Sequence, residues 1–313
     1  MSEKEVRTVT GALDAGSLGV VLPHEHLIHR VSIHSGRADN TWLDVDTAAA
    51  ECRRFRAAGG GAICDVTPLG LGRDPAALRA VSEQSGVPVV SALGLYDTWT
   101  QPDEVRGRPA RVVADYLERG AEGCGLIGEI ASHNESGHAD WRRYALYASE
   151  RDLFAGAARA QQRTGLAVTT HASLGRGGVA QTRMLIDSGA APERVIIGHC
   201  DAHLHGDEAL DLDYYEALLA LGVCLEFDLF GWDELAPDAL RARRIATLCD
   251  AGHAGRLLIS TDTCRRSQLH GCGGRGFDYV FTSVIPALRA AGVSQADIDT
   301  ITRANPARLL STR

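Results

Sequence analysis

Residues 18–29 read LGVVLPHEHLIH, an apolar run that leads directly into two histidines separated by one residue. Side chains alternate across a β-strand, so His24 and His26 point to the same side of the chain. Two imidazoles on one face repel each other when both are charged, and neither gains from burial without a polar partner. A metal ion would resolve both problems, because neutral imidazole is a good ligand for zinc and similar ions. For an isolated pair, solvated loop histidines are an equally good interpretation.

Seven further segments resemble residues 19–26 in being short and apolar, and longer amphipathic segments separate them. They are residues 61–68, 87–96, 125–132, 166–173, 194–201, 222–231 and 256–263. Many of the intervening segments end in glycine, which is typical of the residue that closes a helix. Apolar strands that alternate with helices indicate a parallel sheet covered by helices. This alternation occurs eight times and predicts an α/β fold, a (β/α)8 TIM barrel, with an open doubly wound sheet as the alternative.

The chain is predicted to form a single domain over residues 1–313, since α/β barrels of about 250 residues commonly fold as one unit. We find no linker, low-complexity segment or internal repeat. Residues 6–19 are expected to form a short N-terminal hairpin before the barrel. No GxGxxG follows the first strand and no GxxxxGK[ST] occurs, so nothing in the sequence supports nucleotide binding.

Composition and charge narrow the classes of function. The formal net charge of −8 argues against a nucleic-acid partner, which would require a basic patch. The first residues lack the apolar core of a signal peptide, and no run of 18 apolar residues occurs, so we expect a cytoplasmic protein without a membrane partner. The eight cysteines include no CxxC pair, and several lie in apolar runs, which predicts reduced buried thiols.

Five of the predicted strands end in a polar side chain. Besides the two histidines of residues 24–26, these are Glu129, His171, His199 and Asp262. The carboxyl ends of barrel strands converge on the face where active sites are built. Four imidazoles and two carboxylates would be costly there as unpaired groups, but they satisfy one another as ligands of two divalent ions. Each residue alone is better explained as a hydrogen-bonded core residue, whereas their shared position favours a binuclear metal site.

Charge and geometry suggest a role for each of these residues. The more buried ion would lie between the histidine pair of the first strand and Asp262, and the second ion would lie between His171 and His199. Glu129 would bridge the ions, because a carboxylate has two oxygens. Two such ions lower the pKa of a shared water and polarise a substrate oxygen. Asp262 would accept the proton of this water and deliver it to the leaving group, which describes hydrolysis.

Several motifs at these strand ends resemble the phosphotriesterase family of the amidohydrolase superfamily. They are HEH (24–26), THAS (170–173), IGHCD (197–201), EFDLFG (226–231), STDT (260–263) and the run that begins GGRGFDY (273–279). The resemblance covers essentially the whole chain in order. The best-known members have a carboxylated lysine on the fourth strand, where GLIGEIA (125–131) has Glu129. This chain is therefore similar to the phosphotriesterase homology proteins, a branch in which glutamate takes that role.

The resemblance implies a set of site residues, a cofactor and a chemistry. The implied metal ligands are His24, His26, Glu129, His171, His199 and Asp262. The implied cofactor is two divalent ions, with zinc as the expected metal, and Asp262 is the implied catalytic acid and base. The absence of the lysine disfavours phosphotriester hydrolysis. A homodimer is a further expectation, since relatives often form dimers.

The expected substrate is a small molecule. We expect a metal-bridging hydroxide to attack a carbonyl carbon, with a lactone or carboxylic ester as the leading substrate class. Hydrolysis of an N-acyl amide, a phosphoester or a phosphotriester is the alternative among enzymes. A barrel that binds a ligand without turnover is the alternative from another class, although such a protein has no need of the proton acceptor Asp262.

Loops beyond the strand ends are expected to contact the substrate. Arg265 and Arg266 follow Asp262 by three and four residues, and a guanidinium suits a carboxylate or phosphate group. We hypothesise that one of the two binds an anionic part of the substrate, and a surface salt bridge or a helix cap is the alternative. Tyr96, at the end of the third strand, is interpreted as a hydrogen-bond donor to a substrate oxygen or as a wall of the pocket.

These loops contain two further pairs of residues that we interpret. Trp99 and Trp232 are expected to form apolar walls of the substrate pocket. His203 and His205 form a second HxH pair, but their neighbours are polar. We interpret them as solvated loop residues, and not as primary metal ligands.

Overall fold

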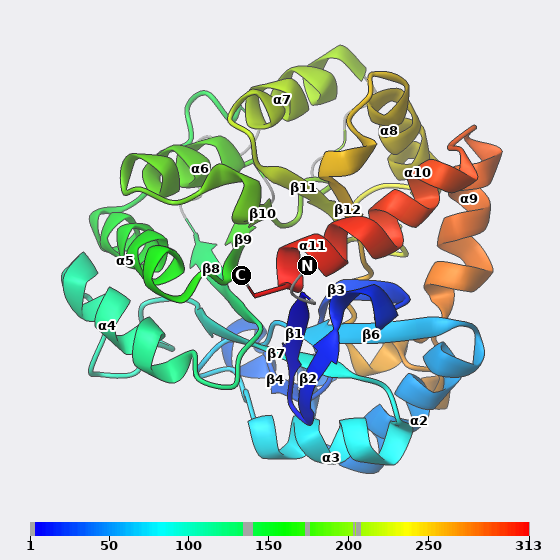
Figure 1. The fold of residues 1–313 in the computed structure, drawn as a ribbon, viewed down its shortest axis with the longest axis horizontal. Coiled ribbons are helices and arrows are strands. Elements are labelled where there is room, and N and C mark those ends of the chain that lie inside the picture. The colour runs from blue at the N-terminus through cyan, green and yellow to red at the C-terminus, as the bar shows by residue number, and fades with distance from the viewer. Residues whose placement is uncertain (1–3, 134–139, 173–175, 203, 205–207, 313) are drawn as a thin grey trace.

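Eight parallel strands form a barrel surrounded by helices in the computed structural model of the chain (Figure 1). The structure describes residues 4–133, 140–172, 176–202, 204 and 208–312. The barrel strands are β3 (Val20–Glu25), β6 (Gly60–Asp65), β7 (Val89–Leu95), β8 (Leu126–Ser132), β9 (Ala167–Ala172), β10 (Val195–Ile197), β11 (Cys224–Phe227) and β12 (Leu257–Ile259). Each pairs in parallel with the next strand along the chain, from β3 to β12. This order confirms the predicted barrel.

Most of the main helices follow the strands and cover the outside of the barrel, whereas the last one, α11 (Asn305–Leu310), lies across one end of the barrel (Figure 1). They are α2 (Val45–Ala57), α3 (Pro75–Ser85), α4 (Ala110–Gly120), α5 (Ala148–Thr164), α6 (Gly178–Asp187), α7 (Glu208–Ala220), α8 (Asp238–Asp250), α9 (Ile285–Ala290), α10 (Gln295–Asp299) and α11 (Asn305–Leu310). Helix α3 shows how local sequence sets the ends. The Asp74 side chain accepts hydrogen bonds from the first turn, and Gly86 ends the helix with a φ of 69°.

Two apolar layers hold the barrel together, because alternate strand residues point inward and outward. The inner layer is small, and its members include Val21, Ala62, Cys64, Val90, Ala92, Leu126, Ala167, Ile196, Cys224 and Leu258. The outer layer packs strand residues such as Ile63 and Ile127 against helix residues such as Phe55 and Phe154. The strands are therefore buried on both faces, which explains their nearly continuous apolar sequences.

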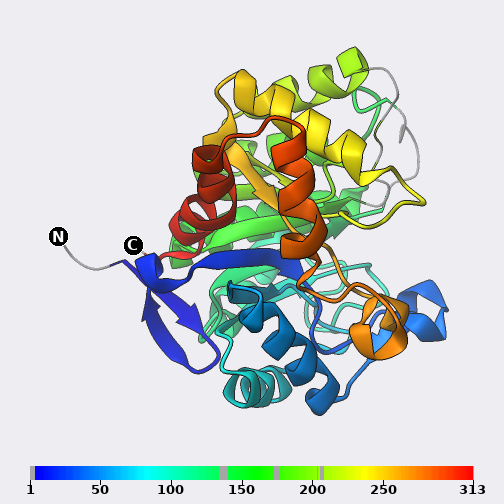
Figure 2. The same cartoon turned by 90° about the vertical axis from the view of Figure 1, so that its right-hand side faces the viewer.

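The amino-terminal end of the barrel is covered by segments from both ends of the chain. Strands β1 (Glu5–Thr8) and β2 (Gly11–Asp14) form an antiparallel hairpin, as predicted, although it is shorter than residues 6–19. Val6 pairs with Ser311 just after α11, and the hairpin lies at the end of the barrel opposite the long loops (Figure 2). This leaves the carboxyl ends of the strands as the open face.

The cysteines and the helices can be compared with two further predictions, namely reduced buried thiols and no membrane partner. All eight cysteines are free, and six of them are buried, while Cys249 is partly buried and Cys272 is exposed. No helix in the part of the chain that the structure describes combines the length and the apolar character needed to cross a membrane.

Candidate metal centre

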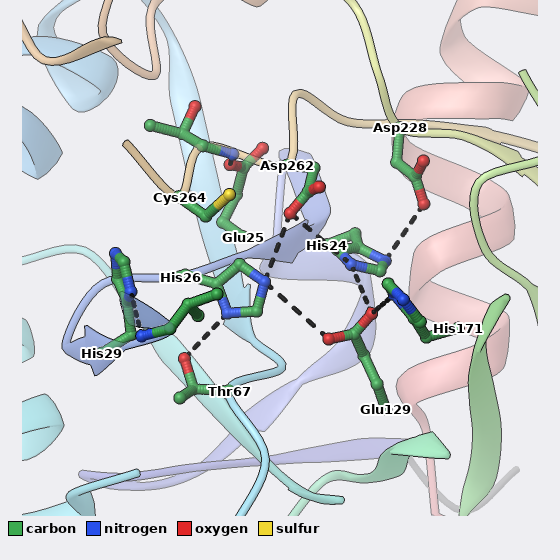
Figure 3. A network of polar contacts seen from close by, with 12 residues as sticks. His24, Glu25, His26, His29, Thr67, Glu129, His171, Asp228, Asp262 and Cys264 are labelled. Atoms are coloured by element: carbon green, nitrogen blue, oxygen red, sulfur yellow. Dashed lines mark hydrogen bonds and ion pairs between the residues drawn. The ribbon is translucent and has the colours of Figure 1, made fainter. Parts of the chain in front are cut away.

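The carboxylate of Glu129, in the middle of β8, lies at the centre of the polar cluster (Figure 3). Its Oε1 atom lies 3.2 Å from His24 Nε2, 3.1 Å from His171 Nδ1 and 3.5 Å from His199 Nε2. The nitrogens of His171 and His199 are themselves 2.7 Å apart. One carboxylate therefore faces imidazoles from three other strand ends.

His26 and Asp262 complete the cluster on the other side of Glu129 (Figure 3). His26 Nε2 lies 3.2 Å from Asp262 Oδ1 and 3.9 Å from Glu129 Oε2. Asp262 Oδ1 is also 3.9 Å from His24 Nε2. The structure thus brings together all six residues that the sequence singled out as metal ligands.

Two of these residues have a left-handed backbone, which is uncommon for residues other than glycine. His199 has a φ of 55° in the turn after β10, and Asp262 has a φ of 42° after β12. Such conformations persist only where the surroundings hold them, and they cluster at functional sites. The residue before His199 is Gly198, where a Cβ would lie 2.3 Å from the carbonyl oxygen of Thr170. Glycine at this point lets the turn pass close to β9.

Asp228, which follows β11, holds His199 in its conformation. Its carboxylate accepts hydrogen bonds from the backbone N–H of His199 at 2.9 and 3.1 Å, and Oδ1 lies 2.9 Å from His199 Nδ1. The other oxygen of Asp228 lies 3.1 Å from His24 Nδ1, and Glu226 Oε2 lies at the same distance from that nitrogen. Both rings therefore direct Nδ1 toward buried carboxylates and Nε2 toward Glu129.

Glu25, the middle residue of the HEH motif, holds the segment that carries Asp262. Its carboxylate accepts hydrogen bonds from Ser260 Oγ at 2.7 Å, from the N–H and Oγ1 of Thr261 at 2.8 Å, and from the N–H of Thr263 at 2.8 Å. The donors flank Asp262 on both sides. Since β3 and β12 stand at the two ends of the strand order, Glu25 also ties the first barrel strand to the last.

The comparisons with known proteins agree with this geometry. The family model for the phosphotriesterase family matches residues 4–310. The chain belongs to this family. It is 32% identical over 297 residues to the phosphotriesterase homology protein of Escherichia coli strain K12, and this match covers 93% of this chain and 97% of the relative. The protein is thus a hydrolase of the phosphotriesterase family, and the predicted resemblance is confirmed.

Other relatives of this phosphotriesterase-family chain differ in the activity that they are named for. It is 27% identical over 356 residues to the N-acetyltaurine hydrolase of Bos taurus, with 98% of each chain covered. Among solved structures, that of the E. coli phosphotriesterase homology protein with phosphate in its active site has a TM-score of 0.85 and 29% identity, and covers 94% of this chain and 99% of that one. The structure of a phosphotriesterase-like lactonase mutant from Deinococcus radiodurans has a TM-score of 0.79 and 30% identity. It covers 97% of this chain and 99% of that one.

The donor set of this family member suits divalent cations. Ligand atoms of His24, His26 and Glu129 lie within 4.8 Å of one another, and so do those of Glu129, His171 and His199. The two groups share Glu129, as expected for a bridging carboxylate. His24 Nε2 is buried, and apart from its ion pair with Glu129 at 3.2 Å it has no polar partner at hydrogen-bond distance among the described residues. A cation between these atoms would satisfy it.

The charges of the site without a cation follow from burial and from its carboxylates. Burial lowers the pKa of His24, but the carboxylates of Asp228 and Glu129 outweigh this effect and raise that pKa well above 6.5. Burial dominates at His171 and lowers its pKa to about 4. Burial raises the pKa of Glu129, yet the imidazoles of His171 and His24 bring it well below its ordinary value. Glu129 is therefore an anion and His171 is a neutral imidazole, the forms that bind metal.

A cavity of about 420 Å³ opens above the cluster in this hydrolase. Tyr96, Trp232 and Arg265 line it together with Glu129 and Asp262. The Tyr96 hydroxyl lies 2.8 Å from His171 Nε2, so the tyrosine contacts a predicted ligand directly.

Other predicted loop residues lie elsewhere. Arg266 lines a separate depression with Trp42 and Cys272, so only the first of the two adjacent arginines reaches the cavity. Trp99 is half exposed and is not among the residues that line the cavity, which corrects its expected place as a wall. Trp99 stands in the turn of residues 98–100 that follows β7. His203 and His205 lie outside the described residues.

Sequence reasoning missed the acidic residues behind the centre, namely Glu25, Glu226 and Asp228. All three are fully buried. A signal was present in CLEFDLF, residues 224–230, where two acids at alternate positions interrupt an otherwise apolar strand. Period-two spacing puts both acids on one face of the strand, and buried acids on one face require shared cationic or hydrogen-bonding partners.

Proposed function

We propose that this protein uses two divalent ions to hydrolyse a bond at a carbonyl carbon. The observation that carries the proposal is the position of Glu129 between two groups of imidazole ligands, with Asp262 beside them at the base of the cavity. His24, His26 and Asp262 would hold one ion, and His171 and His199 the other. Nitrogen and oxygen donors of this kind suit zinc, which is the proposed metal. When bound, the two ions supply an acidified water and polarise the substrate oxygen.

Asp262 is the proposed catalytic acid and base. It is the carboxylate at the cavity whose oxygen lies against His26, at 3.2 Å, and it is only 8% exposed. A carboxylate in this place accepts a proton from the attacking water and returns it to the leaving group. Its left-handed backbone, fixed through Glu25, directs the side chain toward the cluster.

Tyr96 has two proposed roles, because its hydroxyl can accept one hydrogen bond and donate another. If His171 binds metal through Nδ1, its Nε2 carries the proton and donates it to the tyrosine oxygen 2.8 Å away. The ring of His171 is then held in position by a partner outside the metal shell. Tyr96 also lines the cavity, and its hydroxyl is the proposed hydrogen-bond donor to a substrate oxygen there. Burial raises the pKa of Tyr96 well above 10, which keeps that proton in place.

A lactone or carboxylic ester is the first proposed substrate class. It is supported by the similarity to the D. radiodurans lactonase at 30% identity over nearly the whole chain. An N-acyl amide is the second candidate, because proteins named N-acetyltaurine hydrolase match 98% of the chain. The two classes differ in the leaving group, since an amine must be protonated as it departs and therefore depends more strongly on Asp262.

The test is a panel of lactones, carboxylic esters, N-acetyltaurine and a phosphotriester, assayed with protein loaded with zinc. We expect turnover of at least one carbonyl substrate, and we expect a chelator to abolish it. Asp262→Asn should bind metal but lose most of the turnover, by about 100-fold or more. Turnover of the phosphotriester alone, or carbonyl hydrolysis that survives complete metal removal, would contradict the proposal.

The bridging role of Glu129 has its own test. A glutamate carries its carboxylate permanently, whereas a lysine needs carbon dioxide to become carboxylated. Reconstitution of the metal-free protein should therefore proceed equally well with and without added bicarbonate. A strong dependence on bicarbonate would show that the bridge has been assigned to the wrong residue.

A further inference from the structure

We propose that Arg265 and Arg37 form an anion-binding subsite at the rim of the cavity, so that the natural substrate carries an anionic oxygen group, such as a carboxylate or phosphate, near the bond that is cleaved. This inference rests on the proposed hydrolase function and adds the charge of the substrate. Both arginines line the cavity that also contains Glu129 and Asp262.

The surroundings of Arg265 prepare its guanidinium for an anion. Its Cζ lies 4.0 Å from the centre of the Trp232 ring, which fixes the plane of the group. Nη1 pairs with Glu234, so one edge is neutralised and the side chain is only 26% exposed. The Nε atom is buried and has no hydrogen-bond partner in the described part of the chain. A buried N–H without a partner is unfavourable, and because Arg265 lines the cavity, we infer that an acceptor bound there would satisfy it.

Arg37 supplies a second cation at the same rim. It lies just before the short 3₁₀ turn η2 (Ala38–Asn40), is exposed, and forms no ion pair with any carboxylate among the described residues. Its charge is therefore not balanced locally. A guanidinium in this state can bind an oxyanion without first giving up a protein partner.

A tether between the two loops keeps these arginines at one rim. The carboxylate of Asp39 accepts hydrogen bonds from the backbone N–H of Ser267 at 2.9 Å and from its Oγ at 2.6 Å. Arg37 and Arg265 each lie two residues from this tether along their own loops. The loop after β3 and the loop after β12 are thus joined beside the cavity, and both arginines belong to its lining.

The remaining charges of the cavity also favour an anion. The carboxylates that line it are Glu129 and Asp262, and both are proposed metal ligands. With two divalent ions in place, these carboxylates no longer present free negative charge. The rim then offers two arginines, of which only Arg265 has a protein counter-ion, Glu234.

Arg266 provides a matched control within the same loop. It is adjacent to Arg265 in sequence, has the same charge, and lines a different depression. Arg265→Met and Arg266→Met therefore make the same chemical change on and off the cavity. Arg37→Met tests the second member of the subsite at an exposed position, where the substitution removes no buried contact.

The experiment compares 4-nitrophenyl acetate with the 4-nitrophenyl half-ester of succinic acid, which have the same leaving group but differ in charge. We expect the ratio of kcat/KM for the anionic to the neutral ester to fall about 10- to 100-fold in Arg265→Met, and to fall less in Arg37→Met. Arg266→Met should keep the wild-type ratio. An unchanged ratio in both cavity variants, or an equal fall in Arg266→Met, would overturn the proposal.

Calorimetric titration of the zinc-loaded protein with succinate separates this inference from the proposed function. Succinate should bind the wild type and Arg266→Met equally, and Arg265→Met about tenfold or more weakly. Such binding in a protein that turns over no carbonyl substrate of the panel, ester, lactone or amide, would support the subsite and contradict the proposed hydrolysis. Turnover of both esters, with succinate binding unaffected by Arg265→Met and Arg37→Met, would support the hydrolase and overturn the subsite.

Discussion

Asp228 and Glu25 are buried carboxylates that stand behind the candidate metal centre, and each holds a residue with a left-handed backbone. Asp228 contacts the backbone and the ring of His199, and also the ring of His24. Glu25 accepts four hydrogen bonds from the residues around Asp262, and within the described part of the chain the partners of its carboxylate are backbone amides and hydroxyls. Asp228 therefore sets the orientation and charge of imidazoles, while Glu25 sets only the path of the chain.

The largest effect should come from removal of Asp228. Asp228→Ala leaves His199 Nδ1 without its acceptor and leaves His24 Nδ1 with Glu226 alone, so both predicted ion positions should weaken. We expect zinc affinity to fall about 10- to 100-fold, as is usual when an outer partner of a metal-binding histidine is lost. Competition with a chromogenic chelator measures this. A variant that binds zinc as tightly as the wild type would contradict the role assigned to Asp228.

Removal of the charge of Glu25 should give a different result. In Glu25→Gln, an N–H₂ group replaces one acceptor oxygen and faces donors of residues 260–263. We expect kcat to fall about 10- to 100-fold because Asp262 is displaced, while two metal equivalents remain bound. Metal content and kcat should be measured on the same preparation. Loss of metal in parallel with Asp228→Ala would mean that the two carboxylates do not differ in the way proposed.

The stability of the metal-free protein should depend on pH, and Asp228 and Glu25 should differ in their effect on this dependence. Beside Asp228, the pKa values of His24 and His199 are raised well above 6.5 despite burial. Protonation of these imidazoles thus stabilises the folded metal-free protein fully below about pH 6.5, and this contribution is lost as the pH rises through the raised pKa values. Urea unfolding after chelation should show stability that falls with rising pH.

The two carboxylates should affect this pH dependence unequally. Asp228→Asn removes a main cause of the raised pKa values, so the decline with pH should become much shallower. Glu25→Gln should keep a decline similar to the wild type. Equal slopes in all three proteins would show that Asp228 does not control the charge of the imidazoles.

The smallest effect is expected from Ser260→Ala. This change removes one of the four hydrogen bonds to Glu25 and also the acceptor for the backbone N–H of His24, at 3.2 Å. We expect the free energy of unfolding to fall by about 1–2 kcal/mol, with metal content unchanged. Denaturant titration of the zinc-loaded protein measures the change. A loss of metal in this variant would place Ser260, and with it Glu25, closer to the ions than we propose.

The parts of this molecule that the sequence predicts are those with a repeated pattern. Eight apolar strands gave the barrel, and a polar residue at equivalent strand ends gave the cluster around Glu129, because a parallel barrel brings like positions to one face. Asp228 and Glu25 were missed because their partners are single atoms on distant segments, which no periodicity records. The separation of Arg265 from Arg266 likewise depends on the course of one loop, and adjacent residues of equal charge look alike in a sequence.

The most direct test of the account is the metal content of protein purified without chelator, measured by inductively coupled plasma mass spectrometry. If Glu129 joins two ligand groups, each chain should contain about two equivalents of divalent transition metal, or should take up two after reconstitution. Protein that contains none and cannot be loaded with zinc, manganese or cobalt would contradict the account.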